Sequence, residues 1–465
     1  MYDKKYSYQI ITNKNAYKFE IIQKPQKFFE KLKKVILIFD FLFYLLLLGL
    51  NLDSSNSIII KSQSHKNLNQ PIKVAYYCHS IKYGGVERII ALLINKLSNI
   101  KLFKQYLITN LKRQEGEYMI ANNTIRLSLT EQNMNILEMI QKEQIDILIY
   151  NFYKKKEMFE LIKLNKTKTI FFDHSSIFFW IYRGEINFNY SFYSLYKKAK
   201  YVISLIPFEN NFLFKKWGIN SIIMDNLNTY EYDSVFPSDL KGNNIIMAGR
   251  GNDNFKRFDL GIKAMINIIK EIPDALMNII SAPVLKLVQL ITIFKLNNNV
   301  KFIGYLKEPS IYYKNSSLHI LPSLSESYSM VLAEAKIFGI PSIICGLDFL
   351  VLSKGGTVIL YDDDPDIIAK EAIKILKNDR YRKKLGKEAR KSMKIRKNKY
   401  IVKKWINLLS AVYNGEQFHD KISQSISENE INLILNNQLN LLKKRMLIFR
   451  EKTIEELKSL LLNIL

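Results

Sequence analysis

The chain has 465 residues, of which 48% are hydrophobic and 24% are charged, and its formal net charge is +26. This length and composition exclude a disordered chain and predict a globular protein of roughly two or three domains. Such a charge suits nucleic acid, an anionic membrane surface or phosphorylated substrates. The sequence contains no zinc-finger spacing, no aromatic RNA-binding signature and no basic zipper, so we do not expect nucleic acid as a partner. The two cysteines, Cys78 and Cys345, lie in apolar runs and are predicted to be buried thiols.

The first 70 residues contain an apolar segment, Val35–Leu50, which is interrupted only by Asp40 and follows three lysines. At ~1.5 Å per residue its helix is a little shorter than a hydrocarbon core of ~30 Å. We expect a signal-anchor helix over 35–50, between a cytosolic start and a polar stem that ends at residue 70. This predicts a single-pass type II membrane protein, in the ER or Golgi if the source is eukaryotic. A helix packed on the body of the protein, or a membrane-associated cytoplasmic protein, is the alternative.

A first α/β domain is predicted over residues 71–235. Ile72–Cys78 is an apolar, strand-like run, Gly84-Gly85 forms a turn, and Val86–Leu97 follows with a helical pattern. Strand, glycine loop and helix are the opening of a doubly wound domain. Further strands with helical stretches between them are predicted at Gln105–Ile108, Ile145–Tyr150, Lys168–Phe172, Tyr201–Leu205 and Ser221–Met224.

Residues 236–414 are predicted to form a second parallel-sheet domain in tandem with the first. Its last helix has an apolar stripe over Tyr400–Val412. The tail, residues 415–465, is predicted to be helical, and its apolar seam could support self-association or pack on the body of the chain. Strands of the second domain are predicted at Asn244–Ala248, Leu276–Ile280, Lys301–Ile303, Leu318–Leu321, Ser342–Cys345 and Thr357–Leu360, and the seam residues are Leu435, Leu439, Leu442, Met446 and Phe449.

Two runs of the second domain carry residues suited to a sugar diphosphate. Arg250 and Lys256 lie in a polar loop between a strand and a helix, where two cations beside backbone N–H donors favour a diphosphate. Glu326 and Glu334 follow the predicted strand Leu318–Leu321, eight residues apart. Eight residues leave about 80° between two side chains of a helix, so Glu326 is expected in the turn before the helix that contains Glu334. Carboxylates accept the hydrogen bonds of hydroxyl-rich ligands.

These two runs resemble glycosyltransferase family 4, the group 1 enzymes of the GT-B fold, from Ile72 to about Asn414. The resemblance implies an α/β protein whose two Rossmann-like parallel-sheet domains face a cleft. It also implies that the last helix returns to the first domain. Arg250 and Lys256 would then bind the donor diphosphate, Glu326 the donor-sugar hydroxyls and Glu334 the ribose. The glycines Gly84 and Gly85 would let the backbone approach the donor phosphates and the acceptor, and His174 would lie near the reacting sugar.

The chain departs from the family at Ser327-Tyr328-Ser329, where Gly-Phe-Gly is common after the first glutamate. The backbone N–H groups of these three residues are still expected at the donor, although their side chains crowd the turn. Asp362-Asp363-Asp364 formally contains the Asp-x-Asp of metal-dependent transferases. Because Pro365 and a helical pattern follow, this run is predicted to cap a helix, and no metal site is predicted.

The resemblance implies a retaining glycosyltransferase that takes a UDP- or GDP-sugar as its donor and needs neither a metal nor a cofactor. Its acceptor would be a hydroxyl of a glycan or of a lipid-linked saccharide. Two alternatives remain open: a catalytically impaired, membrane-tethered binding or scaffold protein on the same fold, and a sugar-nucleotide epimerase.

Overall fold

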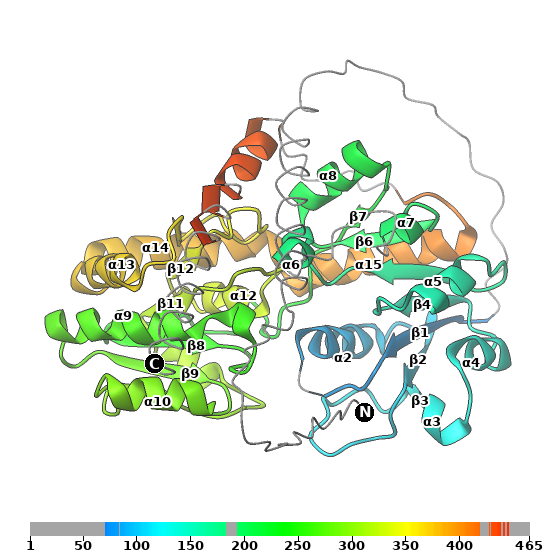
Figure 1. Ribbon diagram of the computed structural model, residues 1–465. Coiled ribbons are helices and arrows are strands. Elements are labelled where there is room, and N and C mark those ends of the chain that lie inside the picture. The colour runs from blue at the N-terminus through cyan, green and yellow to red at the C-terminus, as the bar shows by residue number, and fades with distance from the viewer. Residues whose placement is uncertain are drawn as a thin grey trace, which may run out of the picture. The chain divides into compact units, whose positions relative to one another are not determined.

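A computed structural model describes residues 70–82, 84–182, 193–418, 427, 429–438, 440, 441, 444 and 445 (Figure 1). The predicted signal anchor at 35–50 and most of the stem lie outside these residues. Within the described part, no helix combines the length and the apolar character that a membrane crossing requires.

The first domain contains a parallel sheet formed by the described residues between 72 and 223, in the strand order β3-β2-β1-β4-β5-β6-β7. Its strands are near-continuous apolar runs because helices cover both faces of such a sheet. The strands are β1 (Ile72–Cys78), β2 (Phe103–Thr109), β3 (Ile125–Ser128), β4 (Ile147–Tyr150), β5 (Lys168–Phe172), β6 (Tyr201–Ser204) and β7 (Ile222–Ile223). The helices are α2 (Gly85–Leu97), α3 (Leu129–Gln132), α4 (Ile136–Lys142), α5 (Lys155–Ile162), α6 (Ile177–Tyr182), α7 (Tyr193–Tyr196) and α8 (Pro207–Trp217).

Strand β3 is absent from the sequence prediction. It pairs with β2 at the edge of the sheet, and its first three residues are only half-buried. An edge strand with polar positions such as Arg126 and Ser128 lacks the apolar run that reveals an interior strand. The predicted strand at Ile145–Tyr150 begins two residues later, at Ile147.

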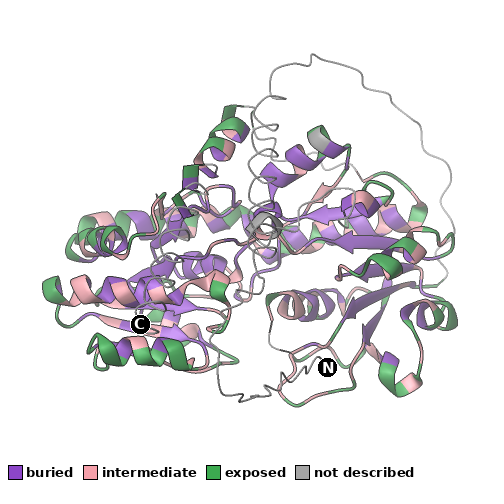
Figure 2. Cartoon of the chain, in the orientation of Figure 1, coloured by how far each residue is buried: buried purple, intermediate pink, exposed green. Residues whose placement is uncertain are grey.

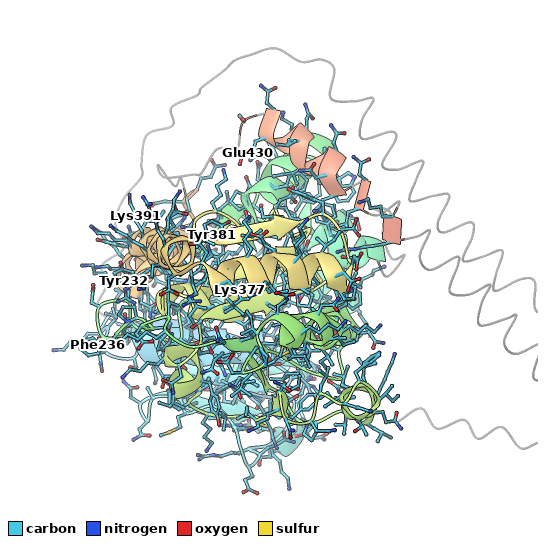
Figure 3. The ribbon with its side chains drawn as sticks, turned by 90° about the vertical axis from the view of Figure 1, so that its left-hand side faces the viewer. Tyr232, Phe236, Lys377, Tyr381, Lys391 and Glu430 are labelled. Carbon is cyan, nitrogen blue, oxygen red and sulfur yellow. The ribbon has the colours of Figure 1, made fainter. Side chains whose placement is uncertain are left out.

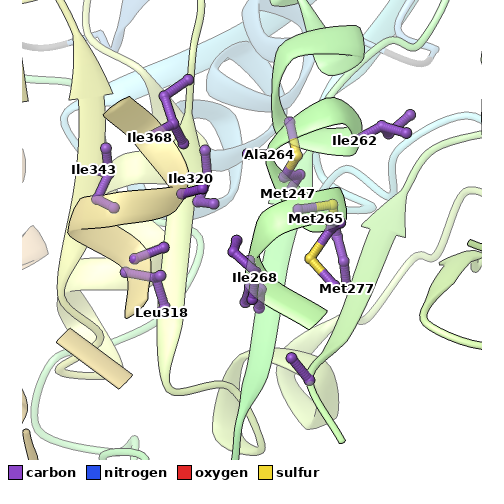
Figure 4. Packing of buried hydrophobic residues seen from close by; sticks show 14 of the residues in the cluster. Met247, Ile262, Ala264, Met265, Ile268, Met277, Leu318, Ile320, Ile343 and Ile368 are labelled. Carbon is purple, nitrogen blue, oxygen red and sulfur yellow. The ribbon is translucent and has the colours of Figure 1, made fainter. Parts of the chain in front are cut away.

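The second domain contains a parallel sheet over the described residues between 244 and 360, in the order β10-β9-β8-β11-β12-β13. Met247, Met277 and Ile320 of this sheet pack against Ile268 of α9 and Ile368 of α13 in one buried cluster (Figure 4). The strands are β8 (Asn244–Ala248), β9 (Leu276–Ile280), β10 (Val300–Phe302), β11 (Leu318–Leu321), β12 (Ser342–Cys345) and β13 (Thr357–Leu360). The helices are α9 (Phe258–Glu271), α10 (Leu285–Ile293), α11 (Ser310–Lys314), α12 (Met330–Ile337), α13 (Pro365–Lys377) and α14 (Asp379–Met393), with short 3₁₀ segments η2 (Asn254–Lys256) and η3 (Lys394–Arg396).

Helix α15 (Asn398–Asn414) returns to the first domain, as expected, and packs against α2 and β4. Trp405 is buried there, with its ring centroid 5.7 Å from that of Phe172. Both cysteines are free and buried, which confirms the prediction for them.

The cation-rich stretch 380–404 is only partly the solvated face that its composition suggests. Lys377 and Lys391, in the last turns of α13 and α14, are both exposed (Figure 3), and both helices carry further exposed residues (Figure 2). Arg382 and Arg396, in contrast, are buried. Arg390 donates to the carbonyl of Tyr232 at 2.9 Å, so part of this charge ties α14 to the connection between the domains.

The described residues of the tail pack on the second domain. This is one of the two alternatives that the sequence left open. The buried face repeats at intervals of three and four, as in an amphipathic helix, and comprises Ile431, Ile434, Gln438, Leu441 and Arg445. Of the seam residues predicted from sequence, only Leu435 is described, and it is half-buried.

Candidate active site

One cavity of about 690 Å³ is lined by residues from loops of both domains. Its loops follow β1 and β5 in the first sheet, and β8 and β11 in the second. Strand order reverses beside β1 and β8, and ligands of open α/β sheets bind at such switch points. All ten site residues predicted from sequence line this cavity: Gly84, Gly85, His174, Arg250, Lys256, Glu326, Ser327, Tyr328, Ser329 and Glu334.

Lys256 and Glu326 form an ion pair inside the cavity. Lys256 Nζ lies 2.6 Å from Glu326 Oε1, and the two side chains are 18% and 10% exposed. Ser323 donates to the same oxygen at 2.8 Å. Among the described residues both partners use Oε1, which leaves Oε2 to accept a hydroxyl from a ligand. Glu326 precedes α12, so it lies in the turn, as the helix geometry predicts.

The second cation, Arg250, is more exposed than Lys256. Its side chain is 62% accessible, and its one ion pair among the described residues is a long contact of 3.4 Å with Asp253. Gly249 precedes it with a φ of +146°, and a Cβ there would lie 3.5 Å from two methylene carbons of Lys256. That distance is an ordinary contact, so glycine is favoured at this position by its φ, which a residue with a side chain rarely adopts.

Glu334 joins the two domains through hydrogen bonds from three donors. Its Oε1 accepts from Arg88 at 2.9 Å and from Thr229 at 2.7 Å, and its Oε2 accepts from Tyr313 at 2.7 Å. The glutamate side chain is 2% exposed and Arg88 is 22% exposed. A carboxylate has about four acceptor positions, so one is left for a ligand unless a protein donor gives way.

The electrostatics of this cluster keep Arg88 charged and Tyr313 protonated. Burial lowers the pKa of the Arg88 guanidinium, but the charge of Glu334 and the contributions of Tyr118 and Tyr313 together outweigh it, and the pKa lies above its ordinary value. Burial, followed by the charge of Glu334, raises the pKa of Tyr313. Arg88 also lies over the ring of Tyr118, 5.4 Å from its centroid. A charged arginine, a neutral tyrosine and a glutamate therefore form a fixed interdomain contact at the cavity wall.

Residues 230–392, roughly a third of the chain, match the sequence model of the group 1 glycosyl transferases. They include both cations and both carboxylates of the cavity, Arg250, Lys256, Glu326 and Glu334. The chain is a glycosyltransferase. No curated protein sequence matches it significantly.

Solved structures share the fold of this glycosyltransferase at low identity. A sucrose-phosphate synthase from Thermosynechococcus elongatus is 15% identical with a TM-score of 0.61, covering 74% of this chain and all of that one. Anabaena HepE in complex with UDP and glucose is 13% identical with a TM-score of 0.57, over 73% of this chain and 100% of its own. WaaG, a glycosyltransferase of lipopolysaccharide biosynthesis, is 13% identical with a TM-score of 0.57, over 72% and 99%. These likenesses establish the GT-B fold.

The turn that departs from the family pattern is tightly packed. Tyr328 and Ser329 are 1% and 5% exposed. Ser329 adopts a left-handed conformation with a φ of +64°, at the residue before α12. Only glycine adopts this region without steric cost, so the transferase holds a serine in a conformation that suits the family's glycine.

His174 follows β5 and reaches the cavity in the neutral form. Its Nε2 lies 2.7 Å from Asn151 Oδ1, and the Asn151 amide nitrogen donates to the carbonyl of Tyr77 at 3.1 Å, which fixes the orientation of the amide. Burial lowers the pKa of His174 to about 3. Nε2 therefore carries the proton and donates to Asn151, while Nδ1 is left as an acceptor.

Gly84 directly precedes α2. A Cβ on Gly84 would lie 1.7 Å from a carboxylate oxygen of Glu87, so a larger residue there would make the Glu87 side chain move. Gly85 is exposed at the first turn of the helix, and both glycines line the cavity. The backbone N–H groups at this helix N-terminus therefore face the cavity side of the first domain.

The aspartate run caps a helix, as predicted. Asp364 accepts a hydrogen bond from the backbone N–H of Asp366 at 2.8 Å and caps α13. Among the described residues, no group of three or more histidine, cysteine, aspartate or glutamate side chains is placed to hold a metal ion. Asp363 instead forms ion pairs with two arginines, Arg257 and Arg445.

Sequence reasoning missed the residues that engage Glu334 from elsewhere in the chain. Arg88 is the only one with a local signal, because it directly follows the glycine loop and Glu87. Thr229 lies in the connection between domains, and Tyr313 lies on the short helix α11. Arg88 is 246 residues from Glu334, and no local pattern indicates contacts over such a separation.

Proposed function

We propose that this glycosyltransferase moves a sugar from a nucleoside-diphosphate sugar to an acceptor hydroxyl, and that the anomeric configuration is retained. One observation carries the proposal: two cations, Arg250 and Lys256, and two carboxylates, Glu326 and Glu334, line the same cavity. The retaining outcome follows from the resemblance to family 4 and is the finer part of the proposal.

The charges suit departure of a nucleoside diphosphate. As the glycosidic bond breaks, negative charge grows on the phosphate oxygens, and cations fixed beside them stabilise the transition state more than the ground state. Lys256 is held in place by Glu326 at 2.6 Å, whereas Arg250 is exposed and free to follow the ligand. These two side chains would supply the charge that a divalent cation supplies elsewhere, and we propose a metal-independent reaction.

The two carboxylates would accept hydrogen bonds from the donor's hydroxyl groups. Oε2 of Glu326 would accept from the transferred sugar, and the remaining acceptor position of Glu334 would take one hydroxyl of the ribose. UDP is the first donor nucleotide to test because the similar HepE structure contains UDP and glucose, with GDP as the alternative.

The acceptor would enter from the side of the first domain, where His174 and the loop Gly116–Met119 line the cavity. Met119 of this loop is 87% exposed, and Tyr305 on the other wall is 52% exposed. A polar cavity with exposed apolar side chains at its rim suits an acceptor that joins a saccharide to an apolar group. We therefore propose a lipid-linked saccharide or a glycan as the acceptor.

The test is a panel of UDP- and GDP-sugars with lipid-linked and soluble glycan acceptors, and it measures release of nucleoside diphosphate and the mass of the product. Lys256→Met and Glu326→Gln should each lower the rate by about 10²-fold or more, because both act on transition-state charge or positioning. Lys263→Met is the matched control. It removes a lysine of α9 whose contact is a surface pair with Asp259 at 3.7 Å, and the rate should stay within about twofold.

Wild-type turnover in both cavity variants would refute the proposal. Binding of UDP without any transfer, across the whole panel, would favour the binding or scaffold protein instead. A product with the mass of the donor sugar nucleotide would identify an epimerase.

A further inference from the structure

A buried charge cluster lies where the tail meets the second domain, and Asp363 is its centre. Arg445 forms a fork on this carboxylate, with Nε 2.6 Å from Oδ2 and Nη2 3.2 Å from Oδ1. Arg257 Nη1 forms an ion pair with the same Oδ2 at 2.7 Å. The side chains of Arg445, Asp363 and Arg257 are 4%, 6% and 14% exposed. One aspartate thus pairs with two arginines, one from the start of the second domain and one from the tail, and the three side chains together carry a net charge of +1.

Each arginine is connected to one half of the ion pair in the cavity. Arg257 directly follows Lys256 and adopts a left-handed conformation with a φ of +50°, between η2 and α9. Arg445 Nη1 lies 3.5 Å from the carbonyl of Leu324, a long hydrogen bond, and Leu324 is two residues before Glu326. The backbone N–H of Leu324 donates to the carbonyl of Phe255 at 2.8 Å, which links the two loops directly.

Other described residues of the tail also contact the second domain. Gln438 donates to the carbonyl of Gly346 at 2.6 Å and to Asp348 at 2.8 Å. Gly346 has a φ of +60°, and a Cβ there would lie 2.0 Å from a methyl carbon of Leu441. Earlier in the segment, Glu430, which is labelled in Figure 3, pairs with Lys354 at 2.6 Å. These contacts fix the segment so that Arg445 reaches a buried carboxylate rather than solvent.

We propose that the tail completes the donor half of the active site, with Arg445 acting through Asp363 as a positioning residue for Lys256 and Glu326. The kinetic part of this inference rests on the proposed function, whereas the structural part does not. Without the guanidinium, Asp363 would hold only Arg257, and Leu324 would lose its contact to the tail. The loop that carries Glu326 would then sample more conformations, and a misplacement of about 1 Å can lower a transfer rate by about 10²-fold.

The first test measures hydrogen exchange of the peptide that contains Leu324 and Glu326 in the full chain. Arg445→Met should raise its exchange rate at least tenfold, because the variant keeps an unbranched apolar stem and removes the fork. Lys444→Met is the matched control on the same helix. That lysine is 54% exposed and pairs with Asp362 at 2.8 Å, so its loss should leave the exchange of this peptide unchanged.

The second test measures kcat and KM for the sugar nucleotide that reacts fastest in the panel, together with the affinity for UDP. Arg445→Met should lower kcat at least tenfold, with a smaller change in UDP affinity, because UDP lacks the sugar that Glu326 would contact. Arg445→Lys restores the charge without the fork and should recover part of the loss. If Arg445→Met does not fold, Arg445→Lys takes its place in both tests. A merely structural role would lower thermal stability in both variants and leave kcat unchanged below the unfolding temperature.

Unchanged exchange at the Leu324 peptide in both arginine variants would overturn the positioning role, whatever the kinetics show. Faster exchange in a protein that transfers no sugar from any donor would instead refute the proposed function and leave the structural link standing. Equal losses of kcat in Lys444→Met and Arg445→Met would also overturn the proposal, because the effect would then belong to the tail's charge in general.

Discussion

Replacing Glu334 tests whether the interdomain cluster stabilises the fold as well as lining the donor cavity. Glu334→Ala removes a 2% exposed carboxylate from Arg88 and leaves the hydroxyls of Thr229 and Tyr313 without their acceptor. Breaking a buried ion pair by removing one partner costs about 3–5 kcal/mol. Domains are stable by only about 5–15 kcal/mol, so this variant would lose activity partly because it unfolds. Glu334→Gln keeps the shape and two acceptor positions, and should cost about 1.5–3 kcal/mol.

The assay is urea unfolding of Glu334→Gln, Arg88→Met and the double variant. The double-mutant cycle isolates the interaction between the two side chains, and we expect a coupling free energy of about 2 kcal/mol. A coupling below about 0.5 kcal/mol would refute the reasoning, because it would mean that the pair is as weak as an exposed one. Transfer activity of Glu334→Gln, measured well below its unfolding midpoint, should then fall through a higher KM for the donor, since the ribose contact is the one weakened.

Three further predictions concern strain, metals and pH. Ser329→Gly should raise the free energy of unfolding by about 0.5–1 kcal/mol, because it relieves the left-handed conformation of a serine. The control Ser327→Gly should not raise it, because Ser327 has no positive φ. Equal effects of the two variants in thermal unfolding would contradict this prediction. Dialysis against EDTA should leave the transfer rate within about twofold, and an absolute requirement for added Mg²⁺ or Mn²⁺ would contradict the metal-independent proposal. Burial lowers the pKa of His319 to about 3 in the folded protein, below its value of about 6.5 in the unfolded chain. Below pH 6.5 the unfolded chain therefore binds a proton at His319 that the folded protein does not, and the folded protein loses stability as the pH falls. The loss of stability between pH 7 and 5 should therefore be about 2 kcal/mol smaller in His319→Asn, and an unchanged pH dependence would rule this out.

The sequence predicted the parts of the site that depend on local pattern. Strand, loop and helix at 245–265 place Lys256 in the loop between β8 and α9, and the spacing of the glutamates places Glu326 in a turn and Glu334 in a helix. Parallel strands end at the same edge, so these side chains converge once the fold is known. The two parallel-sheet domains themselves were predicted from apolar runs that alternate with helices.

The contacts that depend on long-range packing could not be predicted. The arginine fork on Asp363 needs a tail residue whose neighbours in sequence give no sign of it, and the aspartate run had an adequate local explanation as a helix cap. The tail's apolar residues allow more than one helical stripe. Only docking against Gly346 selects the stripe that contains Leu441, because a glycine there admits the close approach. β3 was missed for a related reason, since a short edge strand has little apolar signal.

The return of α15 bears on how the protein can be divided for study. Its Trp405 is 2% exposed and its Leu408 and Leu409 are fully covered, and the helix packs on α2 and β4 of the first domain. A fragment that stops near residue 235 would present the bare apolar surface that α15 covers, and a fragment from 236 to 414 would carry a helix with no surface to lie on. Expression of either half alone should therefore give an aggregating product. Supplying residues 398–414 by fusion to the first half is the arrangement that the packing favours.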